Sequence, residues 1–142
     1  MKFKTEFLLI VMLFSAISLF AQPKKDDSQI IVTFADTANK WVQAKNAFIR
    51  EGFQVWDIPG DTVRAYPRGF KNIGVIWGLG IIKGNTLILS GIYGFKLTNL
   101  MGNDIVPKKS DVIHISYYKA SKTWKILMNI ANRLGSDISY SK

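Results

Sequence analysis

Two apolar runs, Ile73–Ile82 and Leu87–Phe95, dominate the hydropathy pattern, and the four residues 83–86 join them. Both runs are rich in β-branched and aromatic residues, which favour strands. Between them, Gly84-Asn85 is typical of a two-residue hairpin turn because both residues tolerate positive φ angles. The pattern therefore predicts an antiparallel hairpin with the register Ile82–Leu87, Gly80–Leu89, Gly78–Gly91 and Ile76–Tyr93.

Both faces of this predicted hairpin are apolar. The first face contains the four pairs above and is bare at Gly78 and Gly91, where a ring or another backbone can approach closely. Successive strand residues point to opposite faces, so the remaining residues form a second face. It carries the apolar residues Val75, Trp77, Leu79, Ile81, Ile88 and Ile92.

Two other stretches have the apolar spacing of helices. The first has Asp36 or Thr37 as its cap, runs to Glu51 and ends at Gly52. The second begins after Ser121 and ends at Leu134, just before a glycine. Its apolar stripe is Trp124, Leu127, Met128, Ala131 and Leu134.

Shorter β-rich stretches complete the predicted domain. The expected strands are Gln29–Phe34, Phe53–Ile58, Thr62–Tyr66 and Asp111–Lys119, with a turn at 59–61, a loop at 67–72 and a terminal tail at 138–142 that docks through Tyr140. The resulting order is β-α-β-β-β-β-β-α. It predicts an α+β domain in which an antiparallel sheet of five or six strands has two helices on one face.

The stretch Lys96–Ser110 has no clear place in this order. Glycine and proline interrupt it, yet it contains the apolar residues Leu97, Leu100, Met101, Ile105 and Val106. A loop of fifteen residues is unusual inside a compact domain unless it has a function. The stretch is therefore expected either to cover the second face or to move as a lid over it.

Residues 1–21 are predicted to be a signal peptide. A basic start precedes the uncharged stretch Phe7–Phe20, and Ala21 stands before the expected cleavage point. Fourteen residues are fewer than the roughly 20 that a membrane-spanning helix needs. An uncleaved anchor is the alternative, because Leu19 occupies a position where signal peptidase prefers a small residue.

Charge and composition limit the cellular locations and partners that are expected for this protein. The 142-residue chain has a net charge of +9, and without its leader, which carries two lysines and one glutamate, the charge is +8. Residues 22–28 are a polar, flexible lead-in, and residues 29–142 have the length of a single domain. Cysteine is absent, which excludes disulfides. We expect export to the periplasm or cell envelope of a Gram-negative bacterium. The basic residues serve either solubility or contact with an anionic envelope surface, and nucleic acid is not expected as a partner.

No constellation in the sequence indicates catalysis or metal binding. His114 is the only histidine, and the carboxylates do not form a pair in an apolar setting. The glycines of 78–84 lie within a strand that another strand follows, whereas a dinucleotide fingerprint requires a helix after the glycine turn. We therefore expect a non-enzymatic protein with no catalytic residues, no metal and no cofactor.

A resemblance rests on Tyr66-Pro67-Arg68, on the run 84–91, and on a final helix with Trp124 and a closing Leu134-Gly135. In these the chain resembles small exported domains of unknown function, common in Bacteroidetes, with a TATA-binding-protein-like or helix-grip arrangement. The resemblance covers residues 28–140 and implies a fold but no catalytic residues. The insertion at 96–110 departs from the compact pattern of these domains, which leaves the pairing of the last strand open.

The leading interpretation is an exported, non-catalytic binding or interaction module that uses the second face. The candidate binding residues are Trp77, Leu79, Ile81, Ile88, Ile92, Leu100 and Met101. The candidate partners are an unknown protein, an apolar ligand or a second copy of the chain. The alternatives are a helix-grip carrier of a small apolar ligand and a basic envelope-associated protein. A cavity beneath the last helix would favour the carrier, and an open apolar sheet would favour the interaction module.

The leader makes a direct prediction. Expressed from its full sequence, the protein should be recovered in the periplasm or beyond with Gln22 near its N-terminus, because signal peptidase removes residues 1–21. N-terminal sequencing of the secreted fraction measures this. Recovery of a chain that begins at Met1 in the membrane fraction would instead identify an uncleaved anchor.

Overall fold

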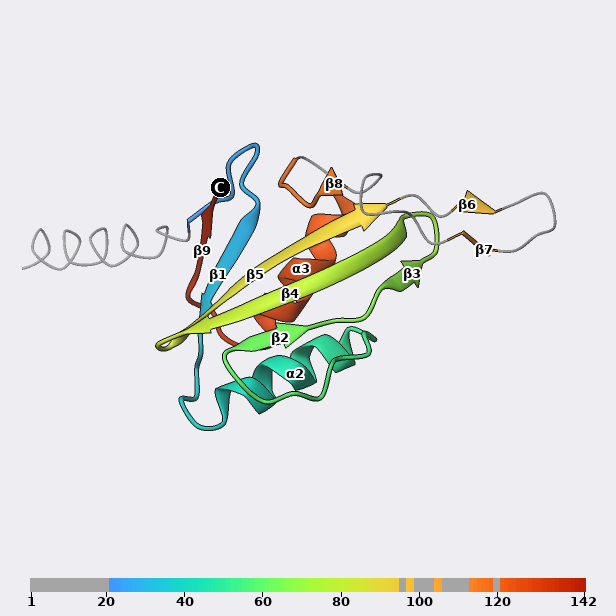
Figure 1. Ribbon diagram of the computed structural model, residues 1–142. Helices are drawn as coiled ribbons and strands as arrows, with labels where there is room; N and C mark the ends of the chain where they lie inside the picture. Colours follow the sequence, from blue (N-terminus) through green and yellow to red (C-terminus); the bar gives the residue numbers. More distant parts are fainter. Residues whose placement is uncertain (1–20, 95–96, 99–103, 106–112, 119–120) are drawn as a thin grey trace, which may run out of the picture.

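The protein is described by a computed structural model that covers residues 21–94, 97–98, 104–105, 113–118 and 121–142. These residues form an α+β domain in which two helices pack on an antiparallel sheet (Figure 1). In chain order the elements are β1 (Gln29–Thr33), α2 (Lys40–Arg50), β2 (Thr62–Arg64), β3 (Arg68–Phe70), β4 (Gly74–Lys83), β5 (Thr86–Gly94), β6 (Leu97–Thr98), β7 (Asp104–Ile105), β8 (Ile113–His114), α3 (Lys122–Asn132) and β9 (Ile138–Ser141). The predicted fold class is confirmed, although the main sheet has seven strands instead of five or six.

The β4–β5 hairpin lies at the centre of this sheet. The strand order is β2-β4-β5-β1-β9. Two short strands complete the main sheet. β3 pairs with the part of β4 that β2 leaves unpaired, and β8 pairs with the part of β5 that β1 leaves unpaired. β6 and β7 pair with each other in a separate two-stranded sheet. The long hairpin therefore supplies the pairing surface on which the other main-sheet strands assemble.

The predicted hairpin register is confirmed. Ile82 pairs with Leu87, and the three other predicted pairs follow in the same ladder. Gly84 takes a φ of 58°, whereas Asn85 does not take a positive φ. A positive φ at the first central residue alone is the pattern of a type II′ turn, whose twist suits an antiparallel hairpin.

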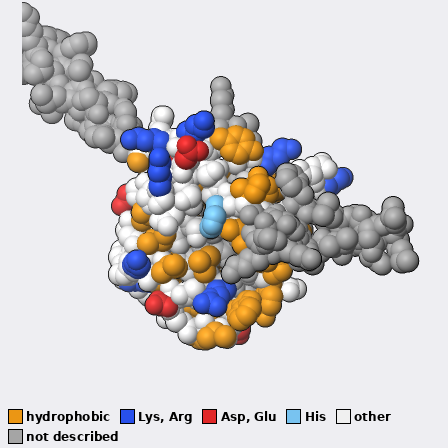
Figure 2. Space-filling view, turned by 45° about the horizontal axis from the view of Figure 1, so that its top comes forward, with side chains coloured by type: hydrophobic (Ala, Val, Ile, Leu, Met, Phe, Trp, Pro, Cys, Tyr) orange, Lys and Arg blue, Asp and Glu red, His pale blue; other side chains and the backbone are white. Residues whose placement is uncertain are grey.

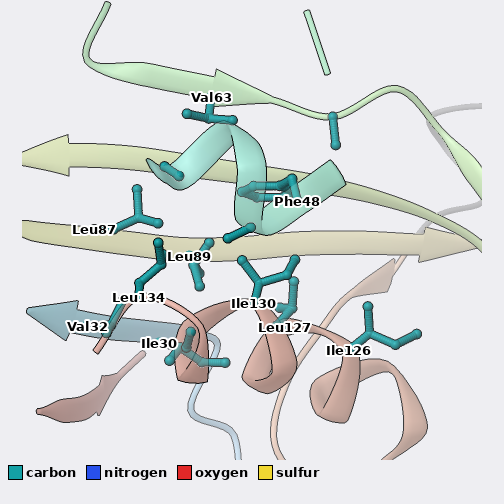
Figure 3. Close-up of a cluster of buried hydrophobic side chains, with 14 of the residues drawn as sticks. Ile30, Val32, Phe48, Val63, Leu87, Leu89, Ile126, Leu127, Ile130 and Leu134 are labelled. Carbon is teal, nitrogen blue, oxygen red and sulfur yellow. The ribbon is translucent and has the colours of Figure 1, made fainter. Parts of the chain in front are cut away.

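The core lies between the helices and the first face of the hairpin. Ile76, Leu87 and Leu89 on that face are fully buried. The bare strip predicted there is filled by the ring of Phe48 from α2, since a Cβ at Gly78 would lie 2.6 Å from that ring. Figure 3 shows Phe48 meeting the strands beside Leu127 and Ile130 of α3. Both helices therefore cover the same face.

Three predicted segments have a different structure. Phe53–Ile58 is not a strand, because only Val55 bridges to Ala65. Phe53 is buried against Phe48, and Asp57 pairs with Lys45, which holds this segment along α2. The predicted loop at 67–72 contains β3, and the predicted tail at 138–142 is β9, paired with β1. Open edges of β4 and β1 supply the backbone partners for these short strands.

The helix ends in the structure agree in part with those predicted from the sequence. Ser121 caps α3 as predicted and accepts a hydrogen bond from the Trp124 backbone N–H at 3.2 Å. The start of α2 was predicted wrongly, because its N-cap is Asn39, with a φ of 48°. Asp36 instead accepts a hydrogen bond from the Ala38 backbone N–H at 2.9 Å, which satisfies this carboxylate within the preceding turn.

The last predicted strand is shorter than expected. Of Asp111–Lys119, the two residues of β8 are paired with β5, and Ile115 is buried against Gly91. Residues 111, 112 and 119 lie outside the described residues. Tyr140 of β9 docks against Trp124, with ring centroids 5.9 Å apart, so the predicted docking of this residue is confirmed.

Valine substitutions at two glycines distinguish the energetic cost of a strained backbone from the cost of a steric clash. A Cβ at Gly84 or at Gly60 would meet no atom within 4 Å, yet only Gly84 has a positive φ. We expect Gly84→Val to lower the free energy of unfolding by about 1–3 kcal/mol, because a β-branched residue resists positive φ. Gly60→Val is the matched control and should change it by less than about 0.5 kcal/mol. Urea denaturation measures both, and equal costs would contradict the turn geometry.

Candidate functional site

The second face of the hairpin lies opposite both helices. Trp77, Leu79, Ile81, Ile88 and Ile92 are all half-buried, whereas Ile76, Leu87 and Leu89 on the first face are fully buried. Val75, at the far end of the second face, is also buried. The structure therefore brings five of the seven predicted binding residues together on one surface.

Neighbouring strands extend this surface. In the pairing register Ile31 of β1 lies beside Ile88, and Arg64 of β2 lies beside Leu79. Paired residues share a face of the sheet. Ile31 therefore joins the apolar centre, while the exposed Arg64 belongs to its polar rim. The sequence could not assign Ile31 to the site, because the register of β1 against β5 depends on a contact between distant segments.

The rim of the second face is polar and contains two basic residues. It includes Thr62, Arg64, Lys83, Thr86 and His114, each in register with a residue of the hairpin's second face or of its turn end. Figure 2 shows hydrophobic side chains around the pale blue histidine on this side of the molecule. An apolar centre with a polar rim is the usual anatomy of a protein–protein interface.

The other two predicted binding residues, Leu100 and Met101, lie outside the described residues. The described parts of the same stretch are β6 and β7. In Figure 1 they lie beyond the end of the β4–β5 hairpin and not across the sheet. These two strands therefore leave the centre of the second face uncovered.

The space beneath α3 is filled by side chains. Leu127 and Ile130 of α3 are fully buried against the sheet residues Ile30 and Leu89, which are also fully buried (Figure 3). A carrier of the helix-grip kind needs a cavity at this position. The packing here favours the sheet surface over the space between sheet and helix as the place where binding occurs.

A hollow of about 350 Å³, lined largely by aromatic side chains, lies beside the N-terminal half of α3. Tyr117 and Tyr140 both pack against Trp124, with centroid distances of 5.7 and 5.9 Å. Burial raises the pKa of Tyr140, and the neighbouring Tyr117 raises it further. The Tyr140 hydroxyl therefore remains protonated near neutral pH. The hollow offers rings and hydroxyl groups, with Lys125 at its edge.

A second hollow, also of about 350 Å³, lies beside β2. Trp56 and Ile58 line it together with Arg64, and both hydrophobic side chains are exposed. Sequence reasoning assigned Trp56 to a strand. Its position in an irregular segment along α2 follows from the tertiary contacts of that segment.

The described residues contain no group of three or more His, Asp or Glu side chains that could hold a metal ion, and no helix among them is long and apolar enough to cross a membrane. His114 is exposed on β8 beside Ile92. No family model matches this chain, and no curated protein or solved structure matches it either. The resemblance to exported domains with a TATA-binding-protein-like or helix-grip arrangement therefore stays a prediction.

Two adjacent residues of β5 test which face is open. Ile88→Asp places a carboxylate on the half-buried second face, and we expect the domain to remain folded with a loss of about 1 kcal/mol. Leu89→Asp buries the same charge in the core and should unfold the domain, because an unpaired buried charge costs several kcal/mol. Circular dichroism and thermal melts measure both variants. Unfolding by both would show that the second face is part of a closed core.

Proposed function

We propose that this protein is an exported, non-catalytic binding module whose second sheet face binds another polypeptide. The observation that carries the proposal is the apolar surface formed by Ile31, Trp77, Leu79, Ile81, Ile88 and Ile92, in which Ser90, opposite Leu79, is the one polar residue of the hairpin between them. A sheet buries one face against helices and needs a second layer for the other. A partner that supplies this layer would bury apolar area, which is the main driving force of association.

Charge favours a partner other than a second copy. Arg64 and Lys83 are exposed at the rim, and the whole chain carries +9. Two copies placed face to face would bring these positive charges together, and like charges across an interface oppose association. A surface with an apolar centre and acidic residues around it would complement this face in both respects.

The remaining alternatives have weaker support. A carrier needs space beneath α3, where Leu127 and Ile130 are fully buried. Catalysis needs titratable groups in a shared pocket, and the hollow beneath the aromatic rings at Tyr140 is lined mainly by apolar side chains and phenol groups. Export is proposed from the apolar stretch Phe7–Phe20 and its basic start.

Photocrosslinking in cells tests the proposal. A photoreactive amino acid at Ile88 should give a discrete polypeptide adduct, whereas the same amino acid at Val42, which is exposed on α2, should not. Trp77→Asp should reduce the Ile88 adduct at least about tenfold, because a central aromatic residue dominates interface energy. Arg64→Glu combined with Lys83→Glu should also reduce it, through repulsion of an acidic partner.

Other outcomes would contradict specific parts of the proposal. An adduct with twice the mass of the chain would identify a second copy as the occupant. An adduct that persists at full yield in a folded Trp77→Asp variant would show that the second face does not determine binding. Absence of any adduct from Ile88 under conditions in which the protein is folded would contradict the function itself.

A further inference from the structure

Most of the exposed large hydrophobic side chains lie at one edge of the domain. Among the described residues seven such side chains are exposed, and five of them belong to α2 and the segment that follows it. These five are Val42 at 46%, Ile49 at 45%, Trp56 at 42%, Ile58 at 66% and Tyr66 at 45% exposure. We call this edge, residues 40–66, the α2 edge. Exposed apolar groups gathered in this way mark an interaction surface.

Specific contacts hold the α2 edge together. The ion pair between Lys45 and Asp57 fastens the segment after α2 to the helix. Val42 and Ile49 lie one turn before and one turn after Lys45 on the helix. The rings of Trp56 and Tyr66 contact each other at a centroid distance of 5.4 Å with an interplanar angle of 30°. The exposed apolar side chains are therefore presented by a fixed surface.

Basic charge accompanies these apolar groups. The α2 edge contains four basic side chains, Lys40, Lys45, Arg50 and Arg64, and three acidic ones, Glu51, Asp57 and Asp61. Two of the three acids are paired, because Asp57 contacts Lys45 and Glu51 contacts Arg133. Arg64 is exposed and lines the hollow beside Trp56 and Ile58. The α2 edge therefore combines apolar side chains with a net positive charge.

We propose that the α2 edge docks on an anionic lipid surface. Tryptophan and tyrosine favour the headgroup level of a bilayer because their rings are apolar and their polar groups stay hydrated. Ile58, the most exposed of the five, lies beside the Pro59-Gly60 bend and enters the boundary of the acyl chains, about 5–10 Å deep. Arg64 contributes attraction to anionic headgroups.

This surface shares Thr62 and Arg64 with the rim of the proposed polypeptide-binding face, but the apolar residues of the two surfaces are different. The α2 edge lies along α2 and β2, and the second face is centred on β4 and β5 (Figure 1). Docking through the edge leaves the centre of the second face accessible. A lipid surface fits the edge better than a folded protein does. With Asp57 and Glu51 held in ion pairs, Arg50 and Arg64 stand beside the apolar side chains against one further acid, Asp61, and a bilayer needs no shape complementarity.

A label at a single position tests the proposal directly. The chain has no cysteine, so Ile58→Cys and Ile113→Cys each give one attachment point for an environment-sensitive fluorophore. Ile113 is 53% exposed on β8, at the opposite edge of the domain from α2 (Figure 1). On phosphatidylglycerol vesicles the label at position 58 should shift to the blue and be quenched by a lipid-bound quencher, and the label at 113 should do neither. A membrane-attached leader does not mimic this result, because it places no lipid at position 58 in particular.

Variants define the contribution of each group. Arg64→Gln should weaken the lipid contact of the label at position 58 about fivefold, since a basic residue near the surface contributes about 1 kcal/mol. Trp56→Ser should weaken it about tenfold. Tyr118→Ser, which removes an exposed ring at the other edge, is the matched control and should have no effect. Physiological salt should weaken the contact relative to low salt, because the Debye length falls.

Three results would overturn the proposal. The first is a label at position 58 that stays in water on anionic vesicles at low salt, which would leave the α2 edge as a surface for protein contact. The second is equal response on neutral phosphatidylcholine vesicles, which would remove the role of charge. The third is equal quenching of the labels at 58 and 113, which would show that the α2 edge has no preference for lipid.

Discussion

The ring of Phe48 lies on a strip of β4 that has no side chains, and the close approach of α2 to the sheet depends on this contact. A Cβ at Gly78 would lie 2.6 Å from the ring and one at Gly80 would lie 3.4 Å from it. Because the strip is bare, α2 comes close enough to bury Phe48 completely. α3 then packs under β5 and β1 with its own apolar stripe. Among the described elements, two helices thereby close the first face, and Phe48, Leu127 and Ile130 are fully buried beneath them.

A consequence is that the described helices supply no layer for the second face. Strands that are apolar on both sides are usual where helices cover both faces of a sheet, as in parallel α/β folds. The hairpin of this antiparallel sheet is apolar on both sides in the same way, although both described helices lie on one side. The half-buried residues around Trp77 are the result, and they are the physical basis for proposing a binding role for this face.

The exposure of the α2 edge depends on the backbone path that follows α2. Gly52 turns the chain back after α2 with a φ of 90°, and the Arg68 guanidinium donates a hydrogen bond to the Glu51 carbonyl beside it. The guanidinium also lies over the ring of Phe70, 4.6 Å from its centroid. These contacts fix the path of the segment that follows, so that Phe53 enters the core while Trp56 and Ile58 remain outside. The apolar residues of the edge are thus exposed by a well-defined backbone path.

The sequence by itself determined the features that depend on neighbours along the chain. A two-residue turn fixes the register of a hairpin, and the alternation of side chains then separates its two faces, so residues such as Trp77 and Ile88 could be assigned to one surface. The Ser121 cap and the bare strip at Gly78 are local in the same sense. Only the tertiary structure decided which face the helices cover, because both faces are apolar. It also decided that Ile138–Ser141 is a strand and that Phe53–Ile58 is not, since an edge strand forms where a distant strand offers unpaired backbone groups. Ile31 joins the second face for the same reason: its neighbour Ile88 is far away in the sequence, and only the pairing of β1 with β5 brings them together.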